Sequence, residues 1–243
     1  MEGDLNLNQL IEDLARFHQC STDIIVQELS SIRKIYPHAA LPTTLRSQEI
    51  WRNKSVDSLK LESVEQFWKT EPCILLELVE AALSSGRMTR RLLAAVWAIA
   101  SGTKTILDYG AGVGEDVKYA REVGLHAIAY EPEGQQSEFI AFRNLPVINA
   151  VPTVPTYDMV WCFEVFPHMV DPFLGVQQIY DCLNPRGILL TTWRFRGSYD
   201  LALSQHSILE ETFVDYIKSI GFHKLAGIEI WPGKTLHAFG VSK

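Results

Sequence analysis

The sequence has 243 residues, of which 47% are hydrophobic and 21% are charged, and its formal net charge at pH 7 is −7. This composition is that of an ordinary globular protein and excludes an intrinsically disordered chain. The acidic balance disfavours nonspecific binding to nucleic acid or to an anionic membrane, so we expect neither as a partner. We expect the local basic clusters, Arg87 with Arg90 and Arg91 and Arg194 with Arg196, to lie on solvated helix or loop faces.

The cysteines predict a reducing environment, because Cys20, Cys73, Cys162 and Cys182 lie far apart and form no C-x-x-C pair. The amino-terminal segment is acidic and lacks the basic start and apolar core of a signal peptide. No apolar run approaches the ~20 residues needed to span a bilayer. We therefore expect a cytoplasmic protein with reduced, mostly structural thiols.

The first hundred residues predict helices only, because their apolar residues recur at helical spacing. The last of these helices is predicted to begin with Thr89 as its cap, to run through Leu92, Val96 and Ile99, and to end at Gly102. The earlier ones are predicted from Leu7 to Phe17, from Ile25 to Ile35, after Pro42, from about Ser58 to Trp68, and from Pro72 to Leu83 with an end near Gly86.

From residue 103 onward, short apolar runs alternate with amphipathic stretches, which is typical of βαβ units and a parallel sheet. Pro232-Gly233 is a turn signal and predicts an antiparallel hairpin at the end of the chain. Strands are predicted near 104–108, 125–130, 146–149, 157–163, 187–193, 222–230 and 235–242, and helices over about 114–123, 134–143, 172–183 and 206–220.

The predicted fold class is therefore α/β, with a seven-stranded, mostly parallel, doubly wound sheet and a C-terminal antiparallel hairpin. We expect two domains: an all-helical cap over residues 1–102 and the sheet domain over residues 103–243.

A glycine turn follows the first strand and is the most informative stretch of the chain. Ile106 and Leu107 predict a buried strand that ends at Asp108, and the small residues of 110–114 lead into a helix from about Glu115. Such a turn places backbone N–H groups and a helix N-terminus around a ligand, and glycines let the backbone approach it closely.

A dinucleotide fold is the rival interpretation, but its G-x-G-x-x-G pattern requires a glycine where Glu115 stands. The carboxylates of Asp108, Glu115 and Asp116 around the turn would also repel a pyrophosphate. The segment resembles motif I of the class I S-adenosylmethionine (SAM) methyltransferases, in which an acidic residue precedes G-x-G-x-G. The resemblance implies that SAM, which carries a sulfonium and an ammonium group, is the cofactor and that S-adenosylhomocysteine (SAH) is its product.

Two polar residues follow the next strands. Glu131, at the end of the second strand and followed by Pro132, can accept hydrogen bonds from ribose hydroxyls, a role that fits both SAM and NAD. Asn149 follows the third strand, where the resembling family places a polar side chain near the adenine amino group; an ordinary loop asparagine is the alternative.

The fourth strand and its exit, Tyr157 to Pro172, resemble a motif of small-molecule methyltransferases of the ubiquinone-biosynthesis type. The resemblance implies that the backbone around Cys162–Glu164 runs alongside the methionine part of SAM. Pro167 replaces a glutamate that helps to hold a metal in some relatives, so we predict no metal site. The predicted cofactor-binding residues are Asp108, Tyr109, Gly110, Ala111, Gly112, Glu131, Pro132, Asn149, Cys162 and Phe163.

The candidate catalytic residues are His168 and Glu164. Histidine is the residue type whose unperturbed pKa lies near neutrality, and His168 is expected at the carboxyl ends of the strands, where ligands bind in open α/β sheets. The alternative is that it packs against the turn at Asp171. The turn 183–187 before the fifth strand is expected to be structural.

The acceptor is expected to contact loop 193–205 and the helical cap. The loop contains Arg194, Arg196 and Tyr199 and is followed by His206. In the cap, Tyr36, Trp51, Phe67 and Trp68 either close over an apolar acceptor or pack between helices; dimerisation through the cap would give a homodimer.

The function expected from this reading is methyl transfer from SAM to an oxygen, nitrogen or carboxylate of a small molecule. Two alternatives stay open: a non-methylating SAM-using enzyme, which catalyses a cyclisation or an alkyl transfer from SAM, and a SAM-binding partner subunit without catalytic activity.

Overall fold

A computed structural model of the chain describes residues 2–35, 37–38, 42–54, 60–82, 84–193, 195, 210–231 and 233–243. The strands are β1 (Thr105–Tyr109), β2 (His126–Tyr130), β3 (Val147–Ile148), β4 (Tyr157–Phe163), β5 (Leu183–Thr192), β6 (Phe222–Trp231) and β7 (Lys234–Val241). Within the described residues they form one seven-stranded sheet in the order β3-β2-β1-β4-β5-β7-β6.

The sheet is parallel except at its C-terminal end. β1 pairs with β2 and β4, β2 with β3, and β4 with β5, all in parallel. β7 runs antiparallel to both β5 and β6. The predicted α/β fold, with its mostly parallel sheet and terminal hairpin, is confirmed.

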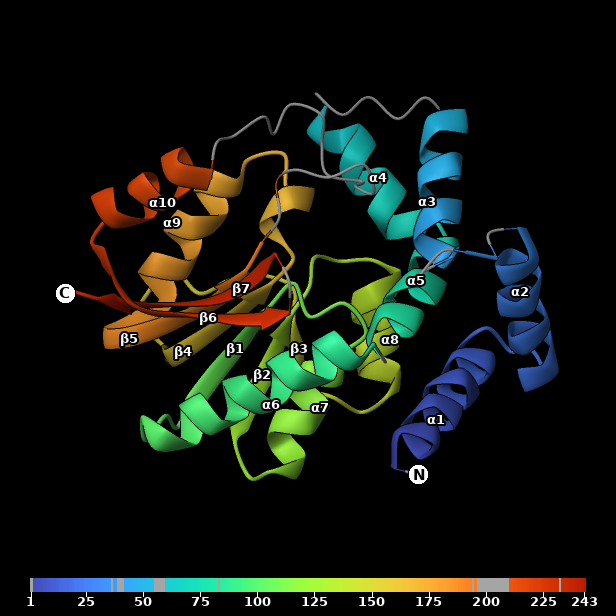
Figure 1. The fold of residues 1–243 in the computed structure, drawn as a ribbon, viewed down its shortest axis with the longest axis horizontal. Helices are drawn as coiled ribbons and strands as arrows, with labels where there is room; N and C mark the ends of the chain where they lie inside the picture. Colours follow the sequence, from blue (N-terminus) through green and yellow to red (C-terminus); the bar gives the residue numbers. More distant parts are fainter. Residues whose placement is uncertain are drawn as a thin grey trace.

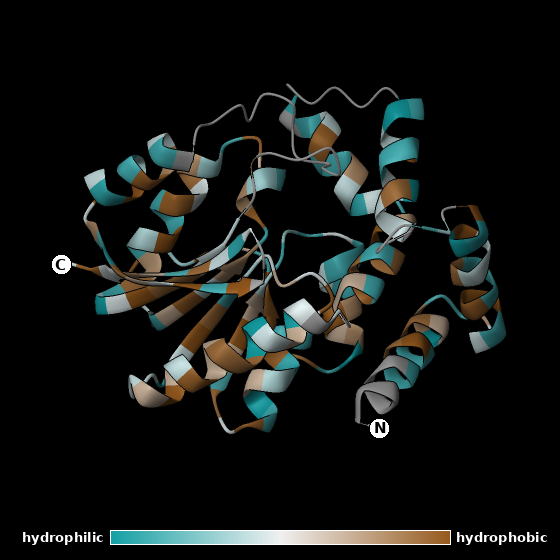
Figure 2. Cartoon of the chain, viewed as in Figure 1, coloured by the Kyte–Doolittle hydropathy of each residue, from teal (hydrophilic) through white to brown (hydrophobic). Residues whose placement is uncertain are grey.

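Helices cover both faces of the sheet, as Figure 1 shows. One face carries α9 (Pro172–Cys182) and α10 (Glu210–Ser219), and the other carries α6 (Ser85–Ala100), α7 (Glu115–Glu122) and α8 (Gln135–Phe142). Strands between two helical layers are buried on both sides, which explains why Ile106 and Leu107 are both fully buried. Figure 2 shows hydrophobic residues concentrated on the strands and on the helix faces that meet them.

The amino-terminal helices gather beyond one end of the sheet (Figure 1). They are α1 (Glu2–Phe17), α2 (Thr22–Ile35), α3 (Pro42–Asn53), α4 (Leu61–Thr70) and α5 (Cys73–Ala82). Apolar residues of α1, α2 and α5 share one core with Val113 of the glycine turn and Phe139 of α8. The helices therefore pack directly against the part of the sheet domain that follows β1 and β2. No helix in the described part of the chain is long and apolar enough to cross a membrane.

The prediction for α6 is wrong in its start. The helix begins at Ser85 and contains both Gly86 and Thr89. Leu92, Val96 and Ile99 are 53%, 54% and 58% exposed, whereas Ala94, Ala95 and Ala98 are buried against the sheet. Alanine lets the helix axis approach the strands closely, so the small residues rather than the large ones face the core. The predicted end is confirmed, because the N–H of Thr103 donates to Ala98 O (3.0 Å) beyond Gly102 at φ 71°.

The prediction for the fifth strand is wrong at its start. β5 begins at Leu183, so the expected turn 183–187 lies inside the strand. Arg186 adopts φ 65°, and the register with β4 shifts between Tyr157 and Met159. A bulge of this kind holds the extra residues while the pairing continues on both sides of it.

Candidate functional site

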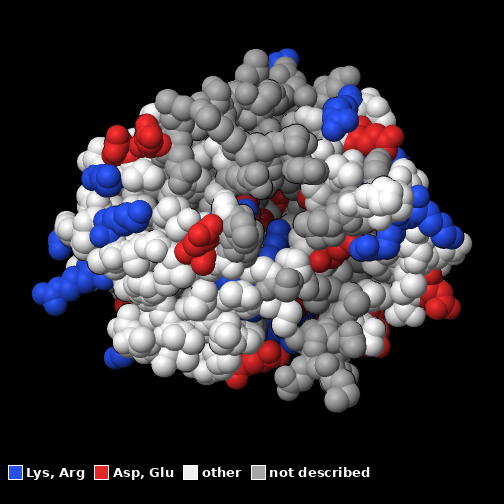
Figure 3. Space-filling model, in the orientation of Figure 1, with Lys and Arg blue, Asp and Glu red and all other residues white. Residues whose placement is uncertain are grey.

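A cleft of about 430 Å³ lies at the carboxyl ends of β1, β2 and β4. The glycine turn, the end of β2 and the exit of β4 line one side, and α4, α5 and α6 line the other. Figure 3 shows a hollow near the centre of this face, with charged side chains of both signs inside it. Open α/β sheets bind ligands at this edge.

The glycine turn is held against β2 and allows no side chain at Gly110. The N–H groups of Gly110 and Ala111 both donate to Tyr130 O, at 2.9 and 3.2 Å. Gly110 adopts φ 74°, and a Cβ at this position would lie 2.5 Å from Cγ2 of Val165. The turn therefore requires glycine both for its backbone conformation and for its contact with the exit of β4.

Glu131 is joined to the glycine turn along one side of the cleft. Its Oε1 accepts a hydrogen bond from the N–H of Gly112, while within the described residues its Oε2 has no hydrogen-bond partner. Burial raises the pKa of Glu131 to about 7, although the hydrogen bond from Gly112 opposes that rise. One carboxylate oxygen thus orients the side chain, and the other is available to a ligand hydroxyl.

Asp108 presents a carboxyl oxygen that has no hydrogen-bond partner among the described residues. The side chain is buried at the end of β1, and its Oδ2 has no hydrogen-bond partner in the described part of the chain. Burial raises the pKa of Asp108 well above its usual value, and the nearby Asp116 carboxylate adds to this effect. An unpartnered buried carboxyl oxygen in a cleft is the position at which a ligand donor completes the site.

The two carboxylates that follow the glycine turn, Glu115 and Asp116, are neutralised by arginines. This corrects the expectation that they repel a pyrophosphate. Asp116 accepts hydrogen bonds from Arg90 (2.5 Å) and Arg91 (2.6 Å), and Glu115 is paired with Arg143. Although burial by itself raises the pKa of Asp116, Arg90 and Arg91 lower it to about 2. The repulsion expected against a pyrophosphate is therefore weaker than the sequence predicts.

The expectation of a solvated arginine cluster on α6 is also wrong. Arg90 and Arg91 are only 3% and 7% exposed, because both turn inward to Asp116. The guanidinium of Arg90 also lies 4.3 Å from the ring centroid of Phe163. Arg194 and Arg196 lie outside the described residues.

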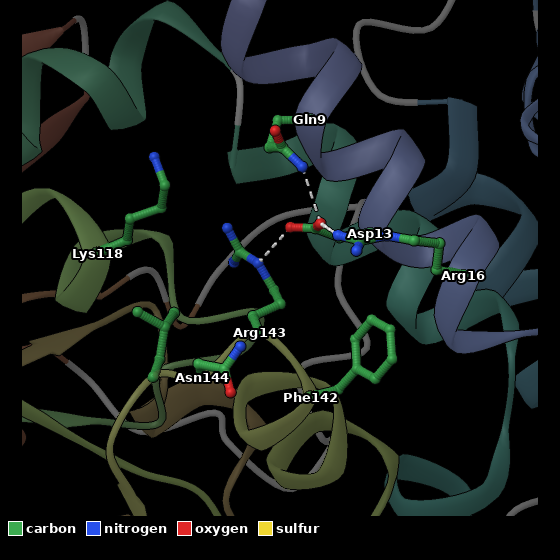
Figure 4. Close-up of a pocket in the computed structure, with 8 residues that line it drawn as sticks. Gln9, Asp13, Arg16, Lys118, Phe142, Arg143 and Asn144 are labelled. Carbon is green, nitrogen blue, oxygen red and sulfur yellow. Dashed lines mark hydrogen bonds and ion pairs between the residues drawn. The ribbon is translucent and has the colours of Figure 1, made fainter.

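Arg143 connects the glycine turn to the first helix. Its Nε donates to Asp13 Oδ2 (3.0 Å), and its two terminal nitrogens donate to Val113 O and to Glu115. A second, polar cavity of about 550 Å³ lies beside these contacts, between α1, α7 and α8. Figure 4 shows Asp13 of α1 between Gln9 and Arg143.

The remaining predicted cofactor-binding residues divide into two groups. Tyr109, Ala111, Pro132 and Phe163 line the cleft, and Tyr109 Oη donates to Gln178 Oε1 (2.7 Å), a contact that the sequence did not predict. Cys162 and Asn149 are not among the described residues that line the cleft.

The reason differs between these two residues. Cys162 is fully buried in the core beneath α9 and α10, because neighbouring strand residues point to opposite faces. Asn149 is exposed, and its Nδ2 donates to Glu131 O (2.9 Å).

Glu164 lies at the exit of β4 with a left-handed backbone at φ 62°. Its carboxylate is paired with Lys234 of β7, a partner 70 residues away that the sequence did not reveal. Although burial raises the pKa of Glu164, Lys234 holds it below its usual value. A carboxylate with a lowered pKa is a weak base.

His168 lies in a short 3-10 helix, η1 (Phe166–His168), and lines the cleft. The Trp68 ring of α4 lies 5.3 Å from the His168 ring at an interplanar angle of 71°. Trp68 also lines the cleft, and its Nε1 is buried with no hydrogen-bond partner among the described residues. Residues of the sheet domain and of the helical region therefore meet at the same point.

Not all the predicted aromatic residues of the cap reach the cleft. Trp51 packs on Phe67 at 4.8 Å within the core of α3, α4 and α5. Tyr36, Tyr199 and His206 lie outside the described residues. In the part of the chain that the structure describes, no group of three His, Cys, Asp or Glu side chains is arranged to hold a metal ion.

Comparisons with known proteins agree with this geometry. A family model described as a methyltransferase domain matches residues 81–230. A search of curated proteins gives no match.

Several solved structures share the fold at low sequence identity. The plantazolicin methyltransferase BpumL in complex with SAH is 13% identical, with a TM-score of 0.56, over 82% of this chain and 100% of that one. Magnesium protoporphyrin IX methyltransferase (ChlM) from Synechocystis PCC 6803 with bound SAM is 14% identical, with a TM-score of 0.56, over 77% of this chain and 98% of that one. The [4+2]-cyclase SpnF is 16% identical, with a TM-score of 0.52, over 65% of this chain and 80% of that one.

Proposed function

Because this chain belongs to the family of methyltransferase domains, we propose that it transfers a methyl group from SAM to an oxygen, nitrogen or carboxylate of a small molecule. The observation that carries the proposal is the glycine turn between the unpartnered Asp108 carboxyl and Glu131. The SAH and SAM bound to BpumL and ChlM support the same cofactor here.

The residues of the cleft fit SAM. Glu131 Oε2 is available to a ribose hydroxyl, and the glycine turn offers backbone N–H groups without a side chain in the way. The buried Asp108 Oδ2 is suited to accept a hydrogen bond from the ammonium group of the methionine moiety. Tyr109, Pro132 and Phe163 add apolar surface along the same wall.

When bound, SAM supplies a methyl group that is attached to a cationic sulfur. An electron pair of the acceptor forms the new bond to the methyl carbon, and the electrons of the broken carbon–sulfur bond remain on sulfur. The protein's part is to align the acceptor with the methyl group and to exclude water. An acceptor that is already a carboxylate needs no base. An acceptor with a proton on its attacking atom must pass that proton to a base.

His168 is the base in this proposal. It lines the cleft beside Trp68 of α4, so an acceptor held under the helical region would lie next to the imidazole. Glu164 instead positions the exit of β4 through its ion pair with Lys234, because its lowered pKa makes it a weak base. The helical cap over residues 1–102 contributes the acceptor wall through α4 and α5.

The test is transfer of a labelled methyl group. Protein is incubated with SAM labelled on the methyl carbon and with fractionated small-molecule extracts, and the label is followed by mass spectrometry. The proposal predicts a labelled small molecule and an equal amount of SAH. SAM that binds tightly but is never consumed with any fraction would contradict it.

A second candidate is a non-methylating reaction in the same cleft, since the similar protein SpnF is a [4+2]-cyclase. A methyl transfer yields SAH, whereas displacement at another carbon of SAM yields methylthioadenosine. A cyclisation consumes no SAM. Product analysis by mass spectrometry separates the three outcomes.

A further inference from the structure

The exposed side of α6 is apolar, although a surface helix normally turns charged residues to solvent. Four large side chains recur along it at helical spacing: Met88, Leu92, Val96 and Ile99. The other exposed side chains described on α6, Thr89 and Ala100, are uncharged as well. Arg90 and Arg91 turn the opposite way and are buried against Asp116. A helix that is apolar on all sides is expected to be covered on all sides.

The edge strand β6 extends this apolar surface. β6 is the outermost strand at its end of the sheet, and it packs against α6. Ile228 pairs with Leu236, which belongs to the core beneath α6, so both side chains point to the α6 side of the sheet. Leu225 lies on that side too, because its Cδ1 is 3.4 Å from the position of a Cβ on Gly240, two residues beyond the core residue Ala238.

The α6–β6 face is defined by six residues, each between 39% and 58% exposed: Met88, Leu92, Val96, Ile99, Leu225 and Ile228. These are six of the thirteen large apolar side chains that are exposed in the described part of the chain. Six half-exposed side chains of this size offer about 400 Å² of apolar surface. A standard interface buries about 800 Å² on each partner, of which about 60% is apolar. The face therefore supplies most of the apolar area that a small dimer interface requires.

The charges of the protein favour a second copy as the partner. Two copies with a formal net charge of −7 repel each other, and the exposed side of α6 brings no like charges together. α6 also has no acidic residue in its first turn and no basic residue in its last turn, so its helix dipole is not compensated. A two-fold axis through the middle of α6 places a second α6 alongside in antiparallel orientation, and each N-terminus then lies beside the partner's C-terminus.

We propose that the α6–β6 face binds the same face of a second copy, so that the protein is a two-fold symmetric homodimer. The inference narrows the expected dimerisation through residues 1–102 to one helix, and it adds the edge of the sheet to the interface. It is independent of the proposed function, because none of the six residues is among the described residues that line the cleft.

The test is sedimentation velocity of the wild-type protein and three variants. Protein concentrations run from about 1 to about 300 µM, which brackets the micromolar dissociation constant expected of a small apolar interface. Leu92→Glu puts a charge near the middle of the face. Ile24→Glu is the matched control, since Ile24 of α2 is 52% exposed, against 53% for Leu92, and lies outside the face. Ile99→Lys is a second interface variant, and a basic residue in the last turn of α6 suits the helix dipole, so folding is not impaired.

The wild-type protein and Ile24→Glu should both pass from monomer to dimer as the concentration rises. Leu92→Glu should raise the dissociation constant about 100-fold or more, because the two-fold axis brings a like charge from each copy into an apolar contact. Ile99→Lys should raise it about tenfold or more for the same reason. Circular dichroism of the monomers should match in all four proteins.

Two results would overturn the proposal. Wild-type protein that stays monomeric over the whole range would leave the face to a partner of another kind. A wild-type dimer that persists equally in Leu92→Glu and Ile99→Lys would show that the copies meet through another surface. If Leu92→Glu does not fold, Ile99→Lys alone decides between these outcomes.

Discussion

Asp13 and Arg143 lie 130 residues apart and are joined by a hydrogen bond of 3.0 Å from Nε to Oδ2. Arg143 is only 3% exposed, and its other nitrogens bond to Val113 O and Glu115 of the glycine turn. The first helix of the chain is therefore tied, through one buried guanidinium, to the turn that we propose holds SAM.

Replacing Asp13 by Ala should destabilise the protein, because Arg143 loses a buried charged partner. We expect a loss of about 1–3 kcal/mol in the free energy of unfolding. Arg16→Ala is the matched control: Arg16 pairs with the same carboxylate but is 65% exposed, so it should cost less than about 1 kcal/mol. Urea unfolding checks both variants, and equal losses would contradict the role given to Arg143.

Gly110→Ala should disrupt the glycine turn more than the same change at Gly102. Both residues have a left-handed backbone, at φ 74° and 71°, which costs about 1–2 kcal/mol for alanine. A Cβ at Gly110 also meets Val165 at 2.5 Å, whereas nothing lies within 4 Å at Gly102. Affinity for SAH should fall in Gly110→Ala and stay at the wild-type level in Gly102→Ala. Calorimetry measures the difference, and an intact affinity in Gly110→Ala would show that the turn does not form the site.

Affinity for SAH should rise as the pH increases from about 6 to about 8. Burial raises the pKa of Glu131 to about 7, and a ribose hydroxyl that donates to Glu131 favours the ionised form. Ligand binding must therefore release a proton below pH 7, at a cost of up to about tenfold in affinity per pH unit. Calorimetry across this range should show the slope in wild-type protein and a flatter profile in Glu131→Gln. Identical profiles would remove Glu131 from the ligand contact.

The same pKa shift has a consequence for stability. The folded pKa of Glu131 lies above its ordinary value of 4.5, so the folded state keeps a proton that the unfolded chain releases. The contribution of Glu131 to stability is therefore fully present below about pH 4.5 and is lost as the pH rises toward about 7. Wild-type protein should lose stability relative to Glu131→Gln across that window in urea unfolding experiments.

His168→Ala should lower turnover without changing SAH affinity. For an acceptor whose attacking atom carries a proton, the expected loss in kcat is on the order of 10²–10⁴-fold. Glu164→Gln is the comparison, since it breaks the pair with Lys234 and should reduce stability but lower turnover less than His168→Ala does. Near-wild-type turnover in His168→Ala would exclude the imidazole as the base.

The sequence predicted the parts of the site that follow from local pattern. The glycine turn, Asp108 and Glu131 each stand at the end of a strand. The end of a strand can be predicted from the sequence because the apolar run stops there. Parallel pairing then brings these ends to one edge of the sheet.

The parts that were missed depend on contacts between distant segments. Asp116 meets arginines 25 and 26 positions away, and Glu164 meets Lys234 from another strand. Nothing in the local pattern marks such partners. On α6, the alanines and the larger apolar residues both recur at helical spacing, so the pattern alone does not tell which face meets the sheet.

The most direct test of the central claim is calorimetry with SAH and NAD on the same preparation. The account predicts that SAH binds at one site per chain, that Glu131→Ala weakens it, and that NAD gives no binding heat. Binding of NAD without binding of SAH would contradict the assignment of the glycine turn to SAM.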